Sequence, residues 1–268
     1  MADAPNTHPN AAPAPWARLG DLTYPEVAAI LARSGPKVAI LPVGSTEAHG
    51  PHLPLATDSI ISEGMAERGA AELARRGVAA LVLPTTHYAV TEWAKDFAGS
   101  TSLAPEVAIG LVLGTCTAVK AMGFDRVVMV SAHLEPGHLV ALREVARRYE
   151  AAVGEPLVFP DKTRRQNAAR LTAEFQSGSC HAGQYETSLV LALRPELVRQ
   201  GLAAALPRRD VALVEHIRAG ATGFLACGMD QAYCGAPADA SAAEGHATLD
   251  ALAAMIADAT LAALPARG

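Results

Sequence analysis

The sequence predicts an α/β fold in which helices flank a mostly parallel sheet. Short runs of β-branched residues alternate with longer, alanine-rich amphipathic stretches, and this alternation is typical of a parallel sheet covered by helices. The 268 residues are enough for one large domain with a sizeable core. We therefore expect a single domain over residues 17 to 268, behind a disordered tail over residues 1 to 16 that is rich in Ala, Pro and Asn.

The individual elements follow from local composition. Four short apolar runs predict strands, at residues 37 to 45, 78 to 86, 126 to 133 and 156 to 160. Five amphipathic or alanine-rich stretches predict helices, at residues 58 to 76, 105 to 122, 136 to 152, 187 to 198 and 239 to 264. Pro105 suits a first helical turn, and Gly77 and Gly123 stand where helices are expected to end.

Charge and cysteine usage narrow the class of protein. The formal net charge is −5, and the Lys and Arg residues are scattered rather than gathered into a basic stripe, so no nucleic-acid partner is expected. The cysteines form neither a zinc-knuckle spacing nor a disulfide framework. We find no signal peptide and no apolar run of the roughly 18 residues that a membrane span needs. A cytoplasmic protein without a membrane partner is the expectation.

Metal-ligating side chains gather after the first and third predicted strands. Glu47 and His49 are two residues apart, so in an extended segment they project to the same side. Asp58 follows, where it is expected to cap the next helix. His133 and Glu135 repeat the spacing at the end of the third strand. Because ligands bind beyond the carboxyl ends of parallel strands, we expect the two clusters to meet at one edge of the sheet.

Together these residues form a mixed nitrogen and oxygen donor set. Such a set suits Zn²⁺, Mn²⁺ or Fe²⁺, and one bridging carboxylate would let it hold two ions. The alternative is a solvated turn, which is the commoner setting of an isolated E-x-H. The second histidine and glutamate pair favours the metal site, but spacing alone leaves both interpretations open.

The segment LPVGSTEAHGPHLPLATD, residues 41 to 58, resembles the signature of the creatininase family of creatinine amidohydrolases and related formamide hydrolases. Further segments are similar to other motifs of the family in the family's order: FAGSTSL (97 to 103), HLE (133 to 135), HAGQYETSLVLALRPELV (181 to 198) and GAPADASAAEG (235 to 245). The resemblance therefore runs from about residue 37 to residue 250. It implies a creatininase-like three-layer α/β/α sandwich and a metal-dependent amidohydrolase.

Carried over residue by residue, the resemblance implies two divalent ions per chain. One ion would be held by Glu47, Asp58 and His133. The other would be held by His49, Asp58 and Glu135, so that Asp58 bridges the two. Zinc is the expected metal, with manganese or iron(II) as alternatives.

The resemblance also implies catalytic groups and an assembly. His181 and Glu186 would be catalytic without being primary ligands, and the ligand Glu135 would share in catalysis. Two ions can lower the pKa of a shared water and polarise a carbonyl oxygen, and His181 would protonate the departing nitrogen. We expect hydrolysis of a C–N amide-type bond in a small lactam, cyclic amide or formamide, by a homo-oligomer that is favoured to be a hexamer.

The chain departs from creatininases proper on the substrate side. No Trp lies between Glu135 and His181, where those enzymes close Trp-rich segments over creatinine, so creatinine is not the expected substrate. Residues 161 to 180 stand there instead, either as a solvated basic helix face or as a lid that presents arginine to an anionic substrate. The candidate substrate contacts are Trp93, Ser100, Arg164 and Arg165.

Two rival functions stay open. The same centre could hydrolyse another bond, such as a C–C bond next to a ketone in a cyclic polyol derivative, a lactone or a terminal peptide bond. A non-catalytic metal-dependent binding or scaffold protein is the alternative from another class. His181 and Glu186 argue against the scaffold, because a protein that only binds needs neither. Among the other histidines, His52 is expected to orient the signature loop and His138 to be exposed.

Overall fold

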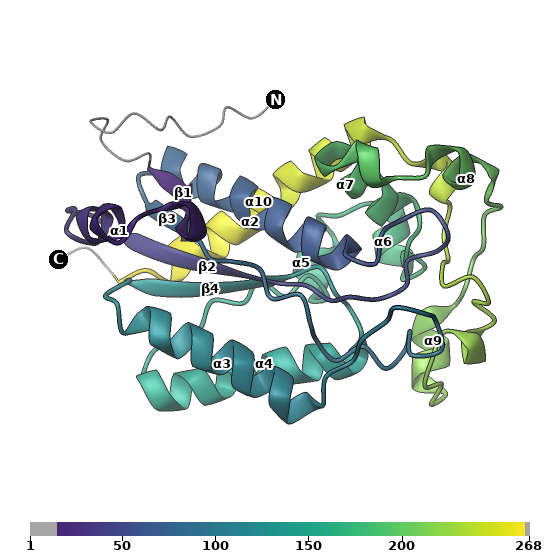
Figure 1. The fold of residues 1–268 in the computed structure, drawn as a ribbon, viewed down its shortest axis with the longest axis horizontal. Coiled ribbons are helices and arrows are strands. Elements are labelled where there is room, and N and C mark those ends of the chain that lie inside the picture. The colour runs from purple at the N-terminus through teal and green to yellow at the C-terminus, as the bar shows by residue number, and fades with distance from the viewer. Residues whose placement is uncertain (1–14, 266–268) are drawn as a thin grey trace.

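The structure, a computed structural model, describes residues 15 to 265 and confirms the predicted α/β fold (Figure 1). The sheet has the strand order β1-β3-β2-β4, and every neighbouring pair is parallel. Its strands are β1 (Trp16–Arg18), β2 (Lys37–Val43), β3 (Ala79–Val82) and β4 (Arg126–Ser131). Because β2 and β4 are neighbours that run in the same direction, the loops that follow them leave the sheet side by side.

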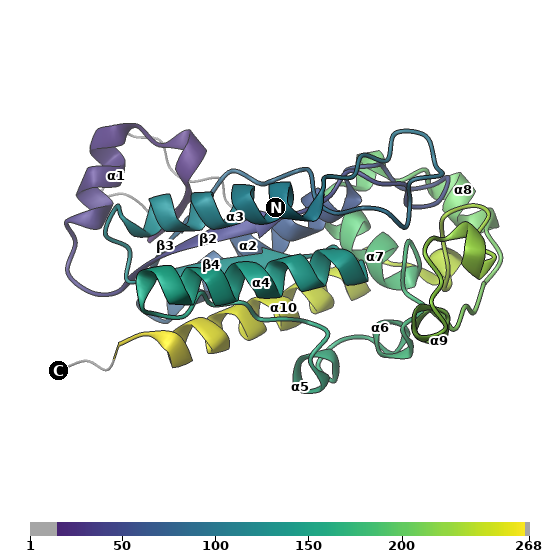
Figure 2. The same ribbon diagram turned by 90° about the horizontal axis from the view of Figure 1, so that it is seen from below.

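Helices cover both faces of the sheet, so the molecule has the three layers that were predicted (Figures 1 and 2). One face carries α2 (Thr57–Arg75), α7 (Gln184–Leu193) and α10 (Ala242–Ala263). The other carries α3 (Pro105–Lys120) and α4 (Pro136–Val153), with α1 (Tyr24–Leu31) at its margin. Among the described residues, no helix is both long and apolar enough to span a membrane.

The strands are apolar throughout because both of their faces are buried. In β2, Val38 and Ile40 point into the core beneath α2, whereas Ala39 and Leu41 point into the core beneath α3 and α4. All four side chains are fully buried. Burying a large aliphatic side chain contributes about 1.5 to 3 kcal/mol, so this central strand anchors the segment that follows it.

The prediction of a strand at residues 156 to 160 is wrong. The structure reduces it to a single bridge between Val158 and Val128, with backbone bonds from Met129 N to Val158 O and from Val158 N to Val127 O. Pro156 and Pro160 have no N–H group to donate to a ladder. The prolines therefore stop the pairing on either side of the bridge.

Strand β1 is an element that the sequence did not predict. It has three residues, too few for a recognisable alternating pattern, and it pairs with β3 through Trp16 and Ala80. The predicted tail at residues 1 to 16 lies mostly outside the described residues, and its last residue, Trp16, begins β1.

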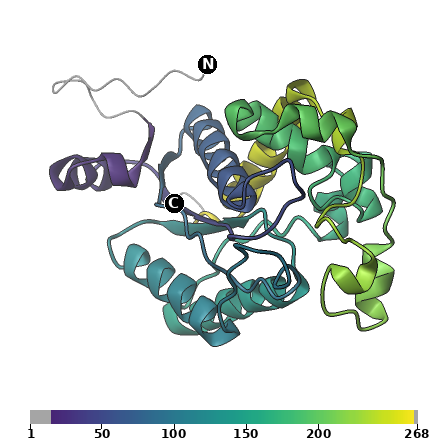
Figure 3. The same cartoon turned by 45° about the vertical axis from the view of Figure 1, so that its right-hand side comes forward.

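Short helices gather at the end of the molecule where the strands finish, which Figure 3 brings forward. They are α5 (Arg165–Ala168), α6 (Ala173–Ser177), α8 (Gln200–Ala205) and α9 (Leu213–Arg218). The sequence suggested a helix only as one interpretation of residues 161 to 180, where α5 and α6 lie, because helices of one or two turns leave little periodicity in a sequence. The helix predicted at residues 187 to 198 begins earlier and ends at Leu193, two residues before Pro195.

Candidate metal centre

The loop after β2 runs close to the helix that follows it. A Cβ built on Gly44 would lie 2.4 Å from Cα of Ser59, so only glycine allows this approach. Gly50 has a φ of 65°, in the left-handed region that favours glycine. These two positions fold the loop back, and they bring Glu47 and His49 to the start of α2.

Asp58 lies in the first turn of α2, and the residue that caps this helix is Ala56 rather than Asp58, contrary to prediction. The carboxylate is therefore free to face the loop. Ser45 Oγ donates a 2.6 Å hydrogen bond to Asp58 Oδ2, which fixes its orientation. Only 1% of Asp58 is exposed.

The cluster after β4 meets the cluster after β2, as the positions of the predicted strands required. His133 Nδ1 lies 3.2 Å from Glu47 Oε1 and 3.0 Å from Asp58 Oδ2. His49 Nε2 lies 3.6 Å from Asp58 Oδ1. Asp58 thus faces one histidine with each of its oxygens.

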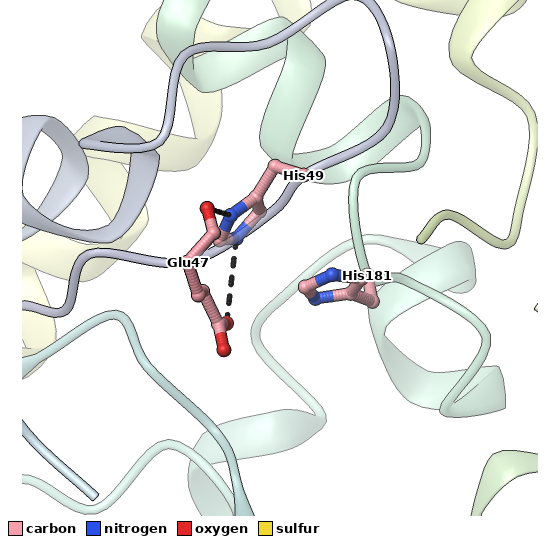
Figure 4. A group of neighbouring side chains, drawn as sticks. All are labelled: Glu47, His49 and His181. Atoms are coloured by element: carbon pink, nitrogen blue, oxygen red, sulfur yellow. Dashed lines mark hydrogen bonds and ion pairs between the residues drawn. The ribbon is translucent and has the colours of Figure 1, made fainter. Parts of the chain in front are cut away.

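Two sets of ligand atoms share Asp58. Among the described residues, three groups each bring one ligand atom per residue within 4.8 Å of the others: Glu47, Asp58 and His133; His49, Asp58 and Glu186; and Glu47, His49 and His181. Figure 4 shows the last group, in which His49 and His181 approach Glu47 from different segments of the chain. The first group is the set predicted for one ion. The second has Glu186 where Glu135 was predicted.

Backbone carbonyls set the proton positions on the two central histidines. His133 Nε2 lies 2.8 Å from Val90 O, and His49 Nδ1 lies 3.2 Å from Glu47 O. A carbonyl only accepts, so each of these nitrogens carries the proton. The remaining ring nitrogens, Nδ1 of His133 and Nε2 of His49, face the carboxylates, where each can hold either a proton or a metal ion.

Two buried atoms of the cluster lack hydrogen-bond partners within the described protein. They are Glu47 Oε2 and His49 Nε2. A buried polar atom without a partner costs about 1 to 3 kcal/mol, and both atoms are suitable metal donors. The donor set and its unpaired atoms therefore fit a site for divalent cations.

The electrostatics of the cluster also fit a site for divalent cations. Burial alone would raise the pKa of Asp58, but His49 and His133 outweigh it and hold that pKa well below its usual range. Burial alone would lower the pKa of His49, but Asp58, Glu186 and Glu47 raise it to about 10. The cluster is strongly negative, and it favours positive charge at its centre.

Glu135 and Glu186 are two further buried carboxylates beside the cluster. Burial raises the pKa of Glu186 to about 7, and its Oε2 accepts a 2.7 Å hydrogen bond from Ala182 N. Burial raises the pKa of Glu135 to about 6, and its Oε2 accepts a 3.1 Å bond from Trp93 N. The ligand role of Glu135 stays a prediction, because the structure groups Glu186 with His49 and Asp58.

His181 stands just before α7, between the ligands and an aromatic ring. Its Nε2 lies 3.0 Å from Ala48 O, and its ring centroid lies 4.4 Å from that of His49 and 4.2 Å from that of Phe224. Burial and the charge of His49 hold the pKa of His181 well below its usual range. The imidazole is therefore neutral near pH 7 and can accept a proton.

A cavity of about 440 Å³ opens beside the ligand atoms. Its polar wall consists of Glu47, Asp58, His133, Glu135, His181 and Glu186. Trp93, a predicted substrate contact, also lines the cavity. Small-molecule sites have volumes of roughly 300 to 1,000 Å³, so the cavity has room for a substrate next to the ligands.

The other predicted substrate contacts lie outside this cavity. Ser100 Oγ accepts a 3.0 Å hydrogen bond from Ala48 N, so it braces the signature loop. Arg164 lines a separate groove, and its Nε lies 3.4 Å from Asp161 Oδ2. Arg165 is exposed and begins α5. The structure therefore gives no support to an arginine lid over the ligands.

Lys162 is a residue near the site that sequence reasoning missed. It was expected on a basic surface segment, but only 3% of it is exposed. Its Nζ lies 3.4 Å from Tyr185 Oη and 3.4 Å from Ala132 O. Burial lowers the pKa of Lys162, while the nearby Glu186 and Asp58 oppose that shift. The apolar run at residues 156 to 160, which precedes Lys162, was the one feature of the sequence that indicated its burial.

Two further histidines support the ligands. His138 was predicted to be exposed, but it is buried, and its ring centroid lies 4.7 Å from that of His133. Its Nε2 lies 3.1 Å from Ser131 Oγ, at the end of β4. His52 Nε2 lies 2.9 Å from Thr187 Oγ1 of α7, so it ties the signature loop to that helix, in line with the role expected of it.

Comparisons with known proteins agree with this geometry. The family model described as "Creatininase: Creatinine amidohydrolase" matches residues 20 to 260. The creatinine amidohydrolase of Pseudomonas putida is 30% identical over 229 residues, which cover 77% of this chain and 85% of that one. The mycofactocin precursor peptide peptidase of Mycobacterium ulcerans is 32% identical over 163 residues, but the match covers only 59% of each chain, less than two thirds of that relative.

A solved structure gives the same result for the fold. The crystal structure of a creatinine amidohydrolase (creatininase) superimposes with a TM-score of 0.69 and 25% identity, over 95% of this chain and 99% of that one. The family match spans nearly all of the described residues, and it includes every residue of the polar wall. The chain therefore belongs to the creatininase family and is a metal-dependent amidohydrolase.

Proposed function

We propose that the chain hydrolyses a C–N amide-type bond in a small molecule, a lactam, cyclic amide or formamide, with the help of two divalent ions. The observation that supports two ions is the pair of ligand groups that share Asp58. Glu47 and His133 would complete one ion's ligands with Asp58. His49 and Asp58 would hold the other together with Glu135, as the resemblance implies. Zinc fits the nitrogen and oxygen donors, and manganese or iron(II) would also be accepted.

When bound, two such ions supply Lewis acidity for the carbonyl oxygen and lower the pKa of water toward neutrality. The chain's own residues orient the substrate and move protons. His181 is neutral near pH 7 because its pKa is lowered, so it would accept a proton from water first and then deliver it to the departing nitrogen. The Ala182 N–H holds Glu186 beside His49, where Glu186 would position the reacting groups.

Hydrolysis of a terminal peptide bond is the second candidate. The name of one relative, mycofactocin precursor peptide peptidase, favours it, because that name describes a peptidase on a related chain. The same carbonyl chemistry would serve either bond. On chemical grounds alone, the same centre would also serve a lactone or a C–C bond next to a ketone in a cyclic polyol derivative. Membership of an amidohydrolase family argues against a non-catalytic scaffold.

The family resemblance also supports a proposal about assembly. We propose a cytoplasmic homo-oligomer, with a hexamer favoured. Light scattering of the purified protein at several concentrations measures its mass directly. A monomer at all concentrations would rule out this assembly without bearing on the metal centre.

Elemental analysis of protein purified without chelators tests the two-ion centre. We expect about two divalent ions per chain, and we expect Asp58→Asn to lose them because both ligand groups need this carboxylate. Asp250→Asn is the matched control, since its side chain is 68% exposed. Unchanged metal content in Asp58→Asn would refute the shared ligand. A metal-loaded protein that hydrolyses no amide, formamide or lactam would refute the reaction and favour the scaffold.

A further inference from the structure

Outside the polar wall, the lining of the cavity of about 440 Å³ is mostly a second, apolar wall, with Arg143, Thr163 and Gln176 as polar exceptions. We call it the apolar wall and define it by Leu139, Val140, Phe175, Val214, Ile217 and Phe224. These residues come from α4, α6, α9 and the segment after α9. No function has been given to this wall so far.

Two residues of the apolar wall are unusually exposed for large aliphatic side chains. Val140 is 65% exposed and Val214 is 44% exposed, yet both line the cavity. Apolar surface in contact with water gains free energy when an apolar group covers it. Exposed apolar side chains that flank a cavity next to catalytic groups indicate a ligand that covers them.

Helix α9 presents one face to the cavity. Leu213, Val214 and Ile217 line it, and they are spaced as neighbours on a helix. The polar residues of the same helix, Glu215, His216 and Arg218, do not line it. Leu213 and Ile217 also pack against the buried cluster that contains Phe224. The helix is therefore oriented with its apolar face toward the substrate space.

The cavity offers little to an anionic substrate. Arg143 is the one lysine or arginine among the described residues that line it. Its Nη2 lies 2.8 Å from Asp161 Oδ2 and 2.9 Å from Thr163 Oγ1. The positive charge of Arg143 is thus already paired. Away from the ligand groups, the lining offers no unpaired cation to a carboxylate or a phosphate, so it suits an uncharged substituent better.

The position of Phe224 indicates which side of the scissile bond meets the apolar wall. Its ring centroid lies 4.2 Å from that of His181, the group that would protonate the departing nitrogen. Resting on the proposed function, we propose that the substrate is a neutral amide or formamide whose nitrogen carries a bulky aliphatic or aromatic substituent, and that the apolar wall binds this substituent. Water adds to the carbonyl carbon, the C–N bond breaks, and the nitrogen leaves with a proton as the apolar amine.

Two isomeric amides test the proposal directly. N-benzylformamide carries its phenyl group on the nitrogen side, whereas 2-phenylacetamide has the same atoms with the phenyl group on the carbonyl side. With metal-loaded protein, we expect kcat/KM for N-benzylformamide to exceed that for N-methylformamide by at least about tenfold. We also expect kcat/KM for N-benzylformamide to exceed kcat/KM for 2-phenylacetamide. Equal values for N-benzylformamide and N-methylformamide would overturn the proposal, and a preference for 2-phenylacetamide would overturn the assigned side.

A pair of valine variants locates the effect. Val214→Glu places a charge on the apolar wall at a position that is 44% exposed, so the fold should tolerate it. We expect it to reduce the preference for N-benzylformamide over N-methylformamide to about one. Val107→Glu, on α3 at a position that is 57% exposed, is the matched control and should keep the full preference. A preference that survives in Val214→Glu would contradict the role of α9.

Binding measurements separate this proposal from the proposed reaction. If the metal-loaded protein hydrolyses no amide, the proposed function fails, but the apolar wall can still be tested with ureas, which are poor substrates for hydrolysis. Calorimetry should show tighter binding of N-benzylurea than of N-methylurea, and Val214→Glu should abolish the difference. Equal affinity of the two ureas would overturn the apolar wall as a substituent site.

Discussion

The polar wall and the apolar wall of the cavity are held by the fold in different ways. Residues of the polar wall follow the ends of β2 and β4 or begin α2 and α7, and backbone groups fix their side chains, as Val90 O fixes His133 and Ala182 N fixes Glu186. Much of the apolar wall comes from α6 and α9, helices of five and six residues. Its side chains are positioned by packing, for example the ring of Phe224 against that of Trp93 with ring centroids 6.0 Å apart.

This difference matches the two tasks of the walls. Metal ligands must be held within about 0.5 Å of their geometry, which long strands and their buried core can provide. Apolar contact is not directional and depends on covered area, so short helices are sufficient for it. The comparison implies that substitutions in the apolar wall can change the substrate while the ligand groups stay intact.

The largest effect is expected where the two ligand assignments disagree. The resemblance gives the second ion to Glu135, and the structure groups Glu186 with His49. We expect Glu135→Gln to lose about one ion per chain, and activity to fall by about a thousandfold or more, because such an ion contributes several kcal/mol to the transition state.

Metal analysis of Glu186→Gln completes this comparison. We expect Glu186→Gln to keep both ions and to lose activity only. Loss of an ion in Glu186→Gln, with full metal content in Glu135→Gln, would reverse the assignment and favour the grouping that the structure shows.

A smaller effect is expected for the proton carrier of the polar wall. His181→Asn should lower kcat by about a hundredfold or more, which is the usual contribution of a general acid or base. Its metal content should match that of the unchanged protein, because His181 is not expected to be a primary ligand. If His181→Asn loses metal, the group of Glu47, His49 and His181 binds an ion, and His181 is a ligand instead of a proton carrier.

The polar wall could be predicted from the sequence, and the reasons are local. Glu47 and His49 are separated by the two-residue period of an extended chain, and they follow a run of buried aliphatic residues that marks a strand. His133 follows a similar run. Parallel neighbours then bring both clusters to one edge of the sheet. The exact partner of His49 could not be predicted, because the choice between Glu135 and Glu186 depends on side-chain orientation.

The apolar wall could not be predicted in the same way. The six residues of α9 are too few for a helical period, and nothing in the sequence near Phe224 connects it with His181. Lys162 was expected at the surface because its neighbours in the sequence are basic. The fold buries it against Tyr185 and Phe175, whose ring centroid lies 5.8 Å from Nζ. These positions depend on tertiary packing between distant segments.

Phe224 provides a more moderate test of the apolar wall. Phe224→Leu keeps an apolar side chain but removes the ring that faces His181. We expect KM for N-benzylformamide to rise by about fivefold while kcat changes little, because contact with the substituent is made equally in the ground state and the transition state. Steady-state kinetics measure both constants. A large fall in kcat with KM unchanged would mean that Phe224 acts by positioning His181.

The smallest effect is expected at Glu144 on α4, which lies one helical turn after the apolar-wall residue Val140. Hydrogen bonds from Arg147 and Arg148 lower the pKa of Glu144 to about 2, below the roughly 4.3 of an unfolded chain. The contribution of Glu144 to stability is therefore complete above about pH 4.3 and is lost as the pH falls through about 2. Glu144→Gln should lower Tm slightly at pH 7 and should match the unchanged protein near pH 2, with Glu150→Gln on the same helix as control. A change in substrate preference in Glu144→Gln would show that any disturbance of α4 reaches the cavity, and the effects at the apolar wall would then need a less specific explanation.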